Sequence, residues 1–241
     1  MNVIILAAAG HSSNLKSEEY PICLTEFNGR PLIEILIEKW KGIKVNFGIM
    51  LDKSDIELYH LDHVIRQINP DAKVYPVSAP TAGAACTALM AVSQINTDEP
   101  LVILNGDELL DIDYLEPLMV FNEKKYDAGT IVFDSVHPRY SYVKLAEDGR
   151  VEEAAEKIPI SRQATAGFYW YRKGSDFVSA VVNYIRKHSL SETPYYICPI
   201  FNELILEQKY IGVFEIDKQK YKPFKSKEQI HHFQTILEQI L

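Results

Sequence analysis

Blocks of apolar and polar residues alternate along the first half of the chain and predict strands and helices in turn. Two segments, 31–40 and 55–68, carry apolar residues at helical spacing, and Pro31 suits a helix start. Four short apolar runs, rich in β-branched residues, have the character of buried strands in a parallel sheet. These runs are residues 3–9, 44–51, 72–77 and 101–104.

From residue 128 the pattern changes to short strands separated by turns. Strands are predicted at 129–133, 141–145, 151–155, 166–171 and 210–216. Helices are predicted at 111–122, 174–188, within 195–206 and at 227–241. Because fewer helices separate these strands, antiparallel pairs are expected to join the sheet. We therefore predict one continuous domain over 1–241, a Rossmann-like three-layer α/β sandwich around a mixed, mostly parallel central sheet.

Composition excludes several classes of protein. With 241 residues and a net charge of −8, the chain lacks the basic balance of a general nucleic-acid binder. Its cysteines, Cys23, Cys86 and Cys198, are odd in number and far apart, which favours buried thiols in a reducing compartment over disulfides. The apolar N-terminal run is too short to span a membrane and has no basic leader. We expect a cytoplasmic protein without a membrane span or a nucleic-acid partner.

Small residues occupy two places where a backbone approaches a ligand. One set follows the first predicted strand, and the other precedes a predicted helix, whose free N–H groups and dipole attract anions. The spacing of the first set matches neither a dinucleotide motif nor a Walker motif, and both sets also suit close packing alone. The candidates for nucleotide binding are Ala8, Ala9, Gly10, Ser12 and Ser13 in the first set, and Thr81, Gly83 and Ala84 in the second.

The predicted strand at 101–104 runs directly into Asn105-Gly106-Asp107. In open α/β sheets ligands gather beyond the carboxyl ends of the strands, so the carboxylate of Asp107 is well placed to bind a divalent cation. The alternative is an ordinary Asx turn or helix cap, in which aspartate and asparagine are common. Asp107 is therefore the main single-residue candidate for catalysis and metal binding.

Taken in order, these motifs resemble the sugar-phosphate nucleotidyltransferases, the glucose-1-phosphate thymidylyltransferase-like branch of the GT-A superfamily. The resemblance covers nearly the whole chain, from a signature loop at 5–15 to the strand that contains Gly167 and precedes the sugar pocket. The matching segments are 5–15, the stretch at Pro21, Asn28 to Glu34, Thr81 to Ala85, Asn105-Gly106-Asp107, Glu156-Lys157 and Ala164 to Gly167.

The resemblance implies that the phosphate of a sugar 1-phosphate, or of a related phosphorylated small molecule, attacks the α-phosphorus of a nucleoside triphosphate and expels pyrophosphate, making precursors for surface polysaccharide. It implies a nucleotide-binding half (1–125) and an acceptor half (126–241), catalytic roles for Asp107 and Lys157, and Mg²⁺ on Asp107 in an active enzyme. The acceptor would contact Glu156, Lys157, Thr165 and Gly167. The oligomeric state is not readable from the sequence, and a homo-oligomer remains open.

Three departures from the family pattern keep alternatives open. Asn14 stands at the position of the family's loop arginine, Ile22 at that of its lysine, and Pro223 where an aspartate completes the metal site. The chain is therefore either an active nucleotidyltransferase or a catalytically impaired protein that binds nucleotide or sugar phosphate. A third hypothesis, a GT-A glycosyltransferase, is less favoured, because the usual Asp-x-Asp metal motif is not at the strand end and only Asp111-Ile112-Asp113, a few residues later, has that spelling.

Overall fold

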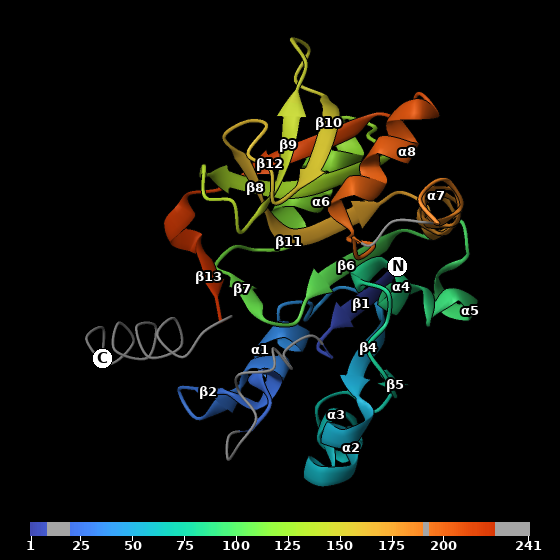
Figure 1. Cartoon of the computed structure of the whole chain (residues 1–241). Coiled ribbons are helices and arrows are strands. Elements are labelled where there is room, and N and C mark those ends of the chain that lie inside the picture. The colour runs from blue at the N-terminus through green and yellow to red at the C-terminus, as the bar shows by residue number, and fades with distance from the viewer. Residues whose placement is uncertain (9–19, 190–192, 225–241) are drawn as a thin grey trace.

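A nine-stranded mixed sheet forms the centre of the protein, in a computed structural model that describes residues 1–8, 20–189 and 193–224 (Figure 1). The main path of the sheet has the order β10-β9-β11-β6-β1-β4-β5, and β8 pairs with both β11 and β12. The strands are β1 (Asn2–Leu6), β4 (Asn46–Asp52), β5 (Lys73–Val77), β6 (Leu101–Asn105), β8 (Ala128–Asp134), β9 (Ser141–Leu145), β10 (Val151–Glu156), β11 (Gln163–Tyr171) and β12 (Ile211–Glu215).

The N-terminal half of the sheet is parallel, and the order in which its strands are added reverses beside β1. Strand β1 pairs with β4 on one side and β6 on the other, and β4 pairs with β5. All five residues of β1 are buried, because both faces of the sheet are covered. The chain thus adds β4 and β5 on one side of β1 and then returns to add β6 on the other side. This reversal places a topological switch point between β1 and β6.

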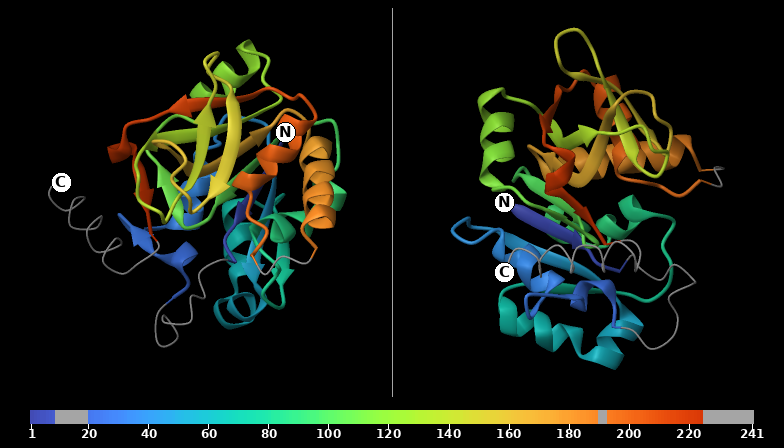
Figure 2. Two further views of the ribbon diagram at one scale, coloured as in Figure 1. Left: turned by 45° about the horizontal axis from the view of Figure 1, so that its top comes forward. Right: turned by 90° about the vertical axis from the view of Figure 1, so that its left-hand side faces the viewer.

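Two layers of helices cover the two faces of the sheet (Figures 1 and 2). Val3 and Ile5 belong to the core on one face, whereas Ile4 and Leu6 belong to the core on the other, as alternation along a strand requires. The first face packs against α1 (Leu32–Glu38), α2 (Lys53–Tyr59), α3 (Leu61–Ile68) and α6 (Leu115–Glu123), and the second against α4 (Ala84–Leu89), α5 (Val92–Ile95), α7 (Gly174–Lys187) and α8 (Phe201–Leu206). The three-layer α/β sandwich is confirmed.

The C-terminal half joins the sheet through antiparallel pairs, as its turn-rich sequence predicted. Strand β11 pairs antiparallel with β6, β8 and β9, and β9 forms a hairpin with β10. The register of β11 against β8 shifts between Thr165 and Tyr169, which marks a bulge. This bulge lies in the strand that joins the two halves of the sheet.

Several element bounds differ from the sequence prediction. The predicted helix at 55–68 is two helices, because His60 adopts a left-handed conformation (φ +53°) that ends α2, and its carbonyl group then accepts from the N–H groups of His63 and Val64 as α3 begins. The predicted helix at 111–122 begins only at Leu115. The residues before it form β7 (Glu108–Leu110), which pairs antiparallel with β13 (Tyr221–Pro223), far away in sequence. The predicted helix at 227–241 lies outside the described residues.

The remaining short elements are β2 (Glu26–Phe27), β3 (Arg30–Pro31) and the 3-10 turns Ile22–Leu24, Cys198–Ile200 and Lys218–Lys220. Strands β2 and β3 form a small antiparallel ribbon before α1, and Pro31 precedes the first residue of that helix. Within the described ranges, no helix is long and apolar enough to cross a membrane.

The three cysteines differ in exposure, which predicts a selective thiol reaction. Cys23 and Cys198 are buried, and burial raises the pKa of the Cys23 thiol to about 12 and that of Cys198 still further above its usual range. Cys86 on α4 is partly exposed. Because the thiolate is the reactive form, we expect Ellman's reagent at pH 8 to label one thiol in the native protein and three in urea. A native Cys86→Ser variant should not react, and rapid labelling of all three native thiols would contradict the buried positions.

Candidate active site

A pocket of about 570 Å³ opens where the parallel strands end. Leu6 and Ala8 line it from the end of β1, and Asn105 and Asp107 line it from the end of β6. Asp52 from the end of β4 and Val77 from the end of β5 complete this side. The pocket thus lies beyond the carboxyl ends of the strands, at the switch point between β1 and β6, where ligands of open α/β sheets bind.

The pocket brings together each candidate site residue that falls within the described ranges. Those lining it are Ala8, Thr81, Gly83, Ala84, Asp107, Glu156, Lys157, Thr165 and Gly167. The other four candidates, Ala9, Gly10, Ser12 and Ser13, lie outside the described residues. The roles that the sequence suggested for these side chains stay predictions, but residues separated by up to 159 positions in the chain share one cavity.

The turn that carries Asp107 is held on both sides. The Gly106 N–H donates to the carbonyl oxygen of Leu6 at 2.9 Å, and a Cβ at Gly106 would lie only 2.8 Å from the Ala7 backbone. On the other side, the Phe224 N–H donates to the Asp107 carbonyl oxygen at 2.8 Å, directly after β13 pairs with β7. The partly exposed Asp107 side chain is therefore presented to the pocket by a backbone with little freedom.

Gly167 lets the bulge in β11 approach the end of β6. Its φ angle is +63°, and a Cβ there would lie 2.2 Å from Glu108 Oε2 and 2.6 Å from Asn105 Nδ2. Glu108 is 5% exposed, and its Oε1 accepts from Asn105 Nδ2 at 3.1 Å. Only glycine fits this left-handed, crowded position. The result is a packed polar floor beneath the pocket.

Beside this floor, the hydroxyl groups of Thr165 and Tyr169 lie 3.0 Å apart. Tyr169 is buried, and burial raises the pKa of its phenol well above the ordinary value. The phenol is therefore a neutral hydrogen-bonding group rather than a charged one at physiological pH. Thr165, predicted as an acceptor-binding residue, is thus engaged with Tyr169 at the pocket wall.

The loop before α4 is bonded to the segment at Tyr195. The Tyr195 N–H donates to Ala82 O at 2.8 Å, and the Ala85 N–H donates to Tyr195 O at 2.9 Å. Gly83 adopts φ +134°, and a Cβ on it would lie 2.5 Å from both the backbone nitrogen and oxygen of Tyr195. The Ala85 N–H is thereby occupied, so this donor is not available to hold an anion at the helix entry as the sequence suggested.

Lys157 and Glu156 come from the edge of the β9–β10 hairpin. Glu156 lies opposite Ser141, whose hydroxyl group donates to the Glu156 carboxylate. Lys157 has a left-handed backbone (φ +58°), and its Nζ donates to the Tyr196 hydroxyl at 3.1 Å and lies 5.0 Å from the centre of that ring. Tyr196 therefore directs the ammonium group at the rim of the pocket.

Among the lining residues that sequence reasoning missed are Arg139, Tyr140 and Ser141. Arg139 and Tyr140 lie on the connection from β8 to β9, Ser141 is the first residue of β9, and no motif marks them. A signal was nevertheless present, because the predicted strands at 141–145 and 151–155 flank a tight turn. Pairing them as a hairpin would have put Ser141 beside Glu156, and its neighbours beside Lys157.

The aspartates of the glycosyltransferase hypothesis lie elsewhere. Asp113 Oδ1 accepts from the Leu115 N–H at 2.9 Å at the start of α6, and the Asp111 N–H donates to Lys220 O at 2.8 Å. Both side chains are exposed, and neither lines the pocket. The Asp-x-Asp spelling is therefore a helix start rather than part of this site.

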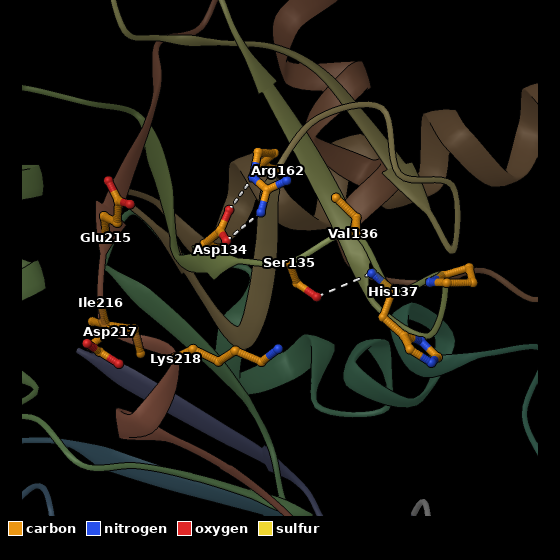
Figure 3. Close-up of a pocket in the computed structure, with 10 residues that line it drawn as sticks. Asp134, Ser135, Val136, His137, Arg162, Glu215, Ile216, Asp217 and Lys218 are labelled. Atoms are coloured by element: carbon orange, nitrogen blue, oxygen red, sulfur yellow. Dashed lines mark hydrogen bonds and ion pairs between the residues drawn. The ribbon is translucent and has the colours of Figure 1, made fainter.

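A second, shallower groove of about 1020 Å³ lies over the connection from β8 to β9 (Figure 3). Arg162 pairs with Asp134 through Nε at 2.6 Å and Nη2 at 2.7 Å, and this guanidinium group lowers the pKa of the Asp134 carboxyl. Lys218 and Glu215 add further charges of both signs. The charges largely balance one another, so the pocket at the strand ends remains the candidate active site.

Comparison with known proteins agrees with this location and fold. A family model described as nucleotidyl transferase matches residues 13–205. The structure of a nucleoside-diphosphate-sugar pyrophosphorylase from Vibrio cholerae RC9 superposes with a TM-score of 0.82 and 19% identity, covering 98% of this chain and 100% of that one. A search of curated proteins found no match.

Two further solved structures share the fold. An inositol-1-phosphate CTP transferase from T. maritima has a TM-score of 0.75 and 14% identity, over 99% of this chain and 95% of that chain. A UDP-glucose pyrophosphorylase complexed with UDP-glucose has a TM-score of 0.73 and 14% identity, over 100% and 99%. At such low identities these likenesses establish the fold alone.

Proposed function

The chain belongs to the nucleotidyl transferase family, and from this premise we propose that it couples a nucleoside triphosphate to a sugar 1-phosphate or a related phosphorylated small molecule. A phosphate oxygen of the acceptor forms the new bond to the α-phosphorus, and the bond between that phosphorus and its bridging oxygen breaks to release pyrophosphate. The observation that carries the proposal is the meeting of Asp107 with Glu156 and Lys157 in one pocket at the switch point.

Such a reaction requires positioning and charge stabilisation more than covalent chemistry from the protein. In our proposal the nucleotide lies against the strand ends and the loop at Thr81 to Ala84, while Lys157 holds the acceptor phosphate. Among the residues that the structure describes, the ammonium group of Lys157 has a phenol as its partner rather than a carboxylate, so its charge is available to an anion. Glu156, bonded to Ser141, offers its carboxylate to hydroxyl groups of the acceptor.

The Asp107 carboxylate, together with the phosphates of a bound nucleotide, fits Mg²⁺ in the manner usual for phosphoryl and nucleotidyl transfer. Mg²⁺ is commonly held by one or two carboxylates together with substrate phosphates, rather than by a complete protein cage. Asp107 faces the pocket, and no group of three or more potential metal ligands occurs within the described ranges. Asp107 would hold the ion together with the triphosphate, and the ion would supply neutralisation of the phosphate charge.

A pyrophosphate-release assay tests the proposed function. We expect the purified chain with Mg²⁺ to release pyrophosphate with at least one pair from a panel of nucleoside triphosphates and phosphorylated sugars. Release should require the acceptor, and mass spectrometry should find the corresponding nucleotide-linked product. The absence of turnover across the panel with both Mg²⁺ and Mn²⁺ would refute the proposal.

One observation favours a second candidate, a protein that binds these ligands without turning them over. Ile22, at the position of the family's lysine, packs against the hydrophobic core and does not line the pocket. One preorganised charge donor is worth roughly 10²–10³ in rate, so its loss weighs against fast catalysis. Thermal shifts with a nucleoside triphosphate and a sugar phosphate, without pyrophosphate release, would select this candidate.

The use of a product in surface polysaccharide follows from the sequence resemblance alone.

A further inference from the structure

Two cations stand side by side on the acceptor side of the pocket. The Lys157 N–H donates to the Tyr140 carbonyl oxygen at 3.1 Å, continuing the β9–β10 pairing by one residue. Arg139 immediately precedes Tyr140, and it lines the same pocket as Lys157. The hairpin edge therefore brings Arg139 and Lys157 close together along the backbone, and both residues line the pocket.

His137 holds the Arg139 side chain. Its Nδ1 lies 3.2 Å from both the backbone nitrogen and Nε of Arg139, and each of these atoms donates to it. Both bonds require Nδ1 to act as the acceptor atom of the ring. The imidazole takes one donor of the guanidinium group and leaves its two terminal nitrogens to other partners.

The backbone of His137 is itself fixed. Its N–H donates to Ser135 Oγ at 3.3 Å, the contact drawn in Figure 3, and its carbonyl oxygen accepts from the buried Tyr142 hydroxyl at 2.8 Å. Arg139 also lies over the Tyr140 ring, with its Cζ 5.6 Å from the centre. The guanidinium group is thus guided from two sides toward the pocket rim.

The charge of Arg139 is not neutralised within the described part of the chain, where it forms no ion pair and its terminal nitrogens have no hydrogen-bond partner. Most other arginines are paired with carboxylates, namely Arg30, Arg66, Arg150 and Arg162. Lys157 likewise has Tyr196 rather than a carboxylate as its partner. Two cations that line one pocket and have no carboxylate partner among the described residues favour a ligand with concentrated negative charge.

We propose that Arg139, held by His137, and Lys157 together bind the phosphate monoester of the acceptor. The assignment rests on the proposed function, because it places the acceptor on this side of the pocket. Arg139 contributes the planar pair of terminal N–H donors, which suits two phosphate oxygens, while Lys157 contributes a compact charge.

Inorganic phosphate is the direct probe, because its binding requires no turnover. Its dissociation constant, measured by phosphorus NMR line broadening at low ionic strength, should rise about 10-fold or more in Arg139→Gln and in Lys157→Gln. Arg139→Lys should fall between Arg139→Gln and the wild type, since charge remains but the fork is lost. Arg186 on α7 is exposed and forms no ion pair with the described residues, so it is the matched control, and Arg186→Gln should leave phosphate binding within about twofold.

An unchanged dissociation constant in Arg139→Gln, or a wild-type protein that shows no saturable phosphate binding, would overturn the assignment. In the enzyme assay, Arg139→Gln should raise KM for the acceptor about 10-fold and leave KM for the nucleoside triphosphate within about twofold. Equal increases in both KM values would also count against it. Loss of phosphate binding in the two pocket variants without any pyrophosphate release by the wild type would uphold the anion site and refute the proposed reaction.

Discussion

Replacing Asp107 with asparagine is expected to lower kcat/KM for pyrophosphate release by about 10³-fold or more. The substitution keeps the size of the side chain and the backbone bonds of the turn, because Asp107 is anchored through its carbonyl group by Phe224. What it removes is the negative charge that would hold Mg²⁺ with the triphosphate. Pyrophosphate release should be measured together with Mn²⁺ affinity, by electron paramagnetic resonance in the presence of nucleotide.

Asp113 provides a matched control for this experiment. It is an exposed aspartate at the start of α6, close to Asp107 in sequence but outside the pocket. Asp113→Asn should cost at most about 1 kcal/mol of stability through the weakened helix start and leave kcat/KM within about twofold. Full activity in Asp107→Asn, or equal losses in both variants, would contradict a metal-binding role for Asp107.

Replacing Gly83 with alanine should have the largest effect on stability among the glycines lining the pocket. Its backbone lies in a region almost exclusive to glycine, with φ +134° and ψ 172°, and the new methyl group would meet the Tyr195 backbone. We expect the free energy of unfolding to fall by about 3 kcal/mol and nucleotide binding to weaken markedly, since the loop before α4 must separate from Tyr195. Chemical denaturation and calorimetric titration would measure the two effects.

Gly149 separates the cost of backbone conformation from that of the contact. It also has a positive φ angle, +79°, but a Cβ there would meet nothing within 4 Å. Gly149→Ala should therefore cost only about 1 kcal/mol, the penalty for placing alanine in a left-handed conformation. If the two variants lost equal stability, the contact of the new methyl group with the Tyr195 backbone would add nothing to the cost of Gly83→Ala.

The parallel half of the sheet could be predicted because its strands are continuous apolar runs. The alternative for such a run is a buried helix, and these runs are too short for one. The position of Asp107 at the pocket could be predicted for a related reason, since a carboxylate at a strand end has a fixed place in such a sheet. The sheet order beyond β6 was not accessible. The pairing of β11 with β6 and β8 depends on contacts distant in sequence, which leave no local periodicity.

The features that sequence reasoning missed share a physical cause. The left-handed conformation of His60 leaves the apolar period of 55–68 intact, so the break between α2 and α3 has no signature in the pattern. Residues 108–110 are a strand only because β13 pairs with them. Arg139 belongs to a connection whose residues follow no period, and only the hairpin register reveals that it stands beside Lys157.

The pairing of β13 with β7 has a consequence for the order in which the protein matures. The turn that carries Asp107 receives its last backbone hydrogen bond from Phe224, more than a hundred residues later in the chain. During synthesis the parallel strands and the first half of the pocket can therefore assemble while this turn still lacks its support. The turn gains this hydrogen bond only after the segment at 221–224 has left the ribosome, so a chain interrupted before Tyr221 would lack it.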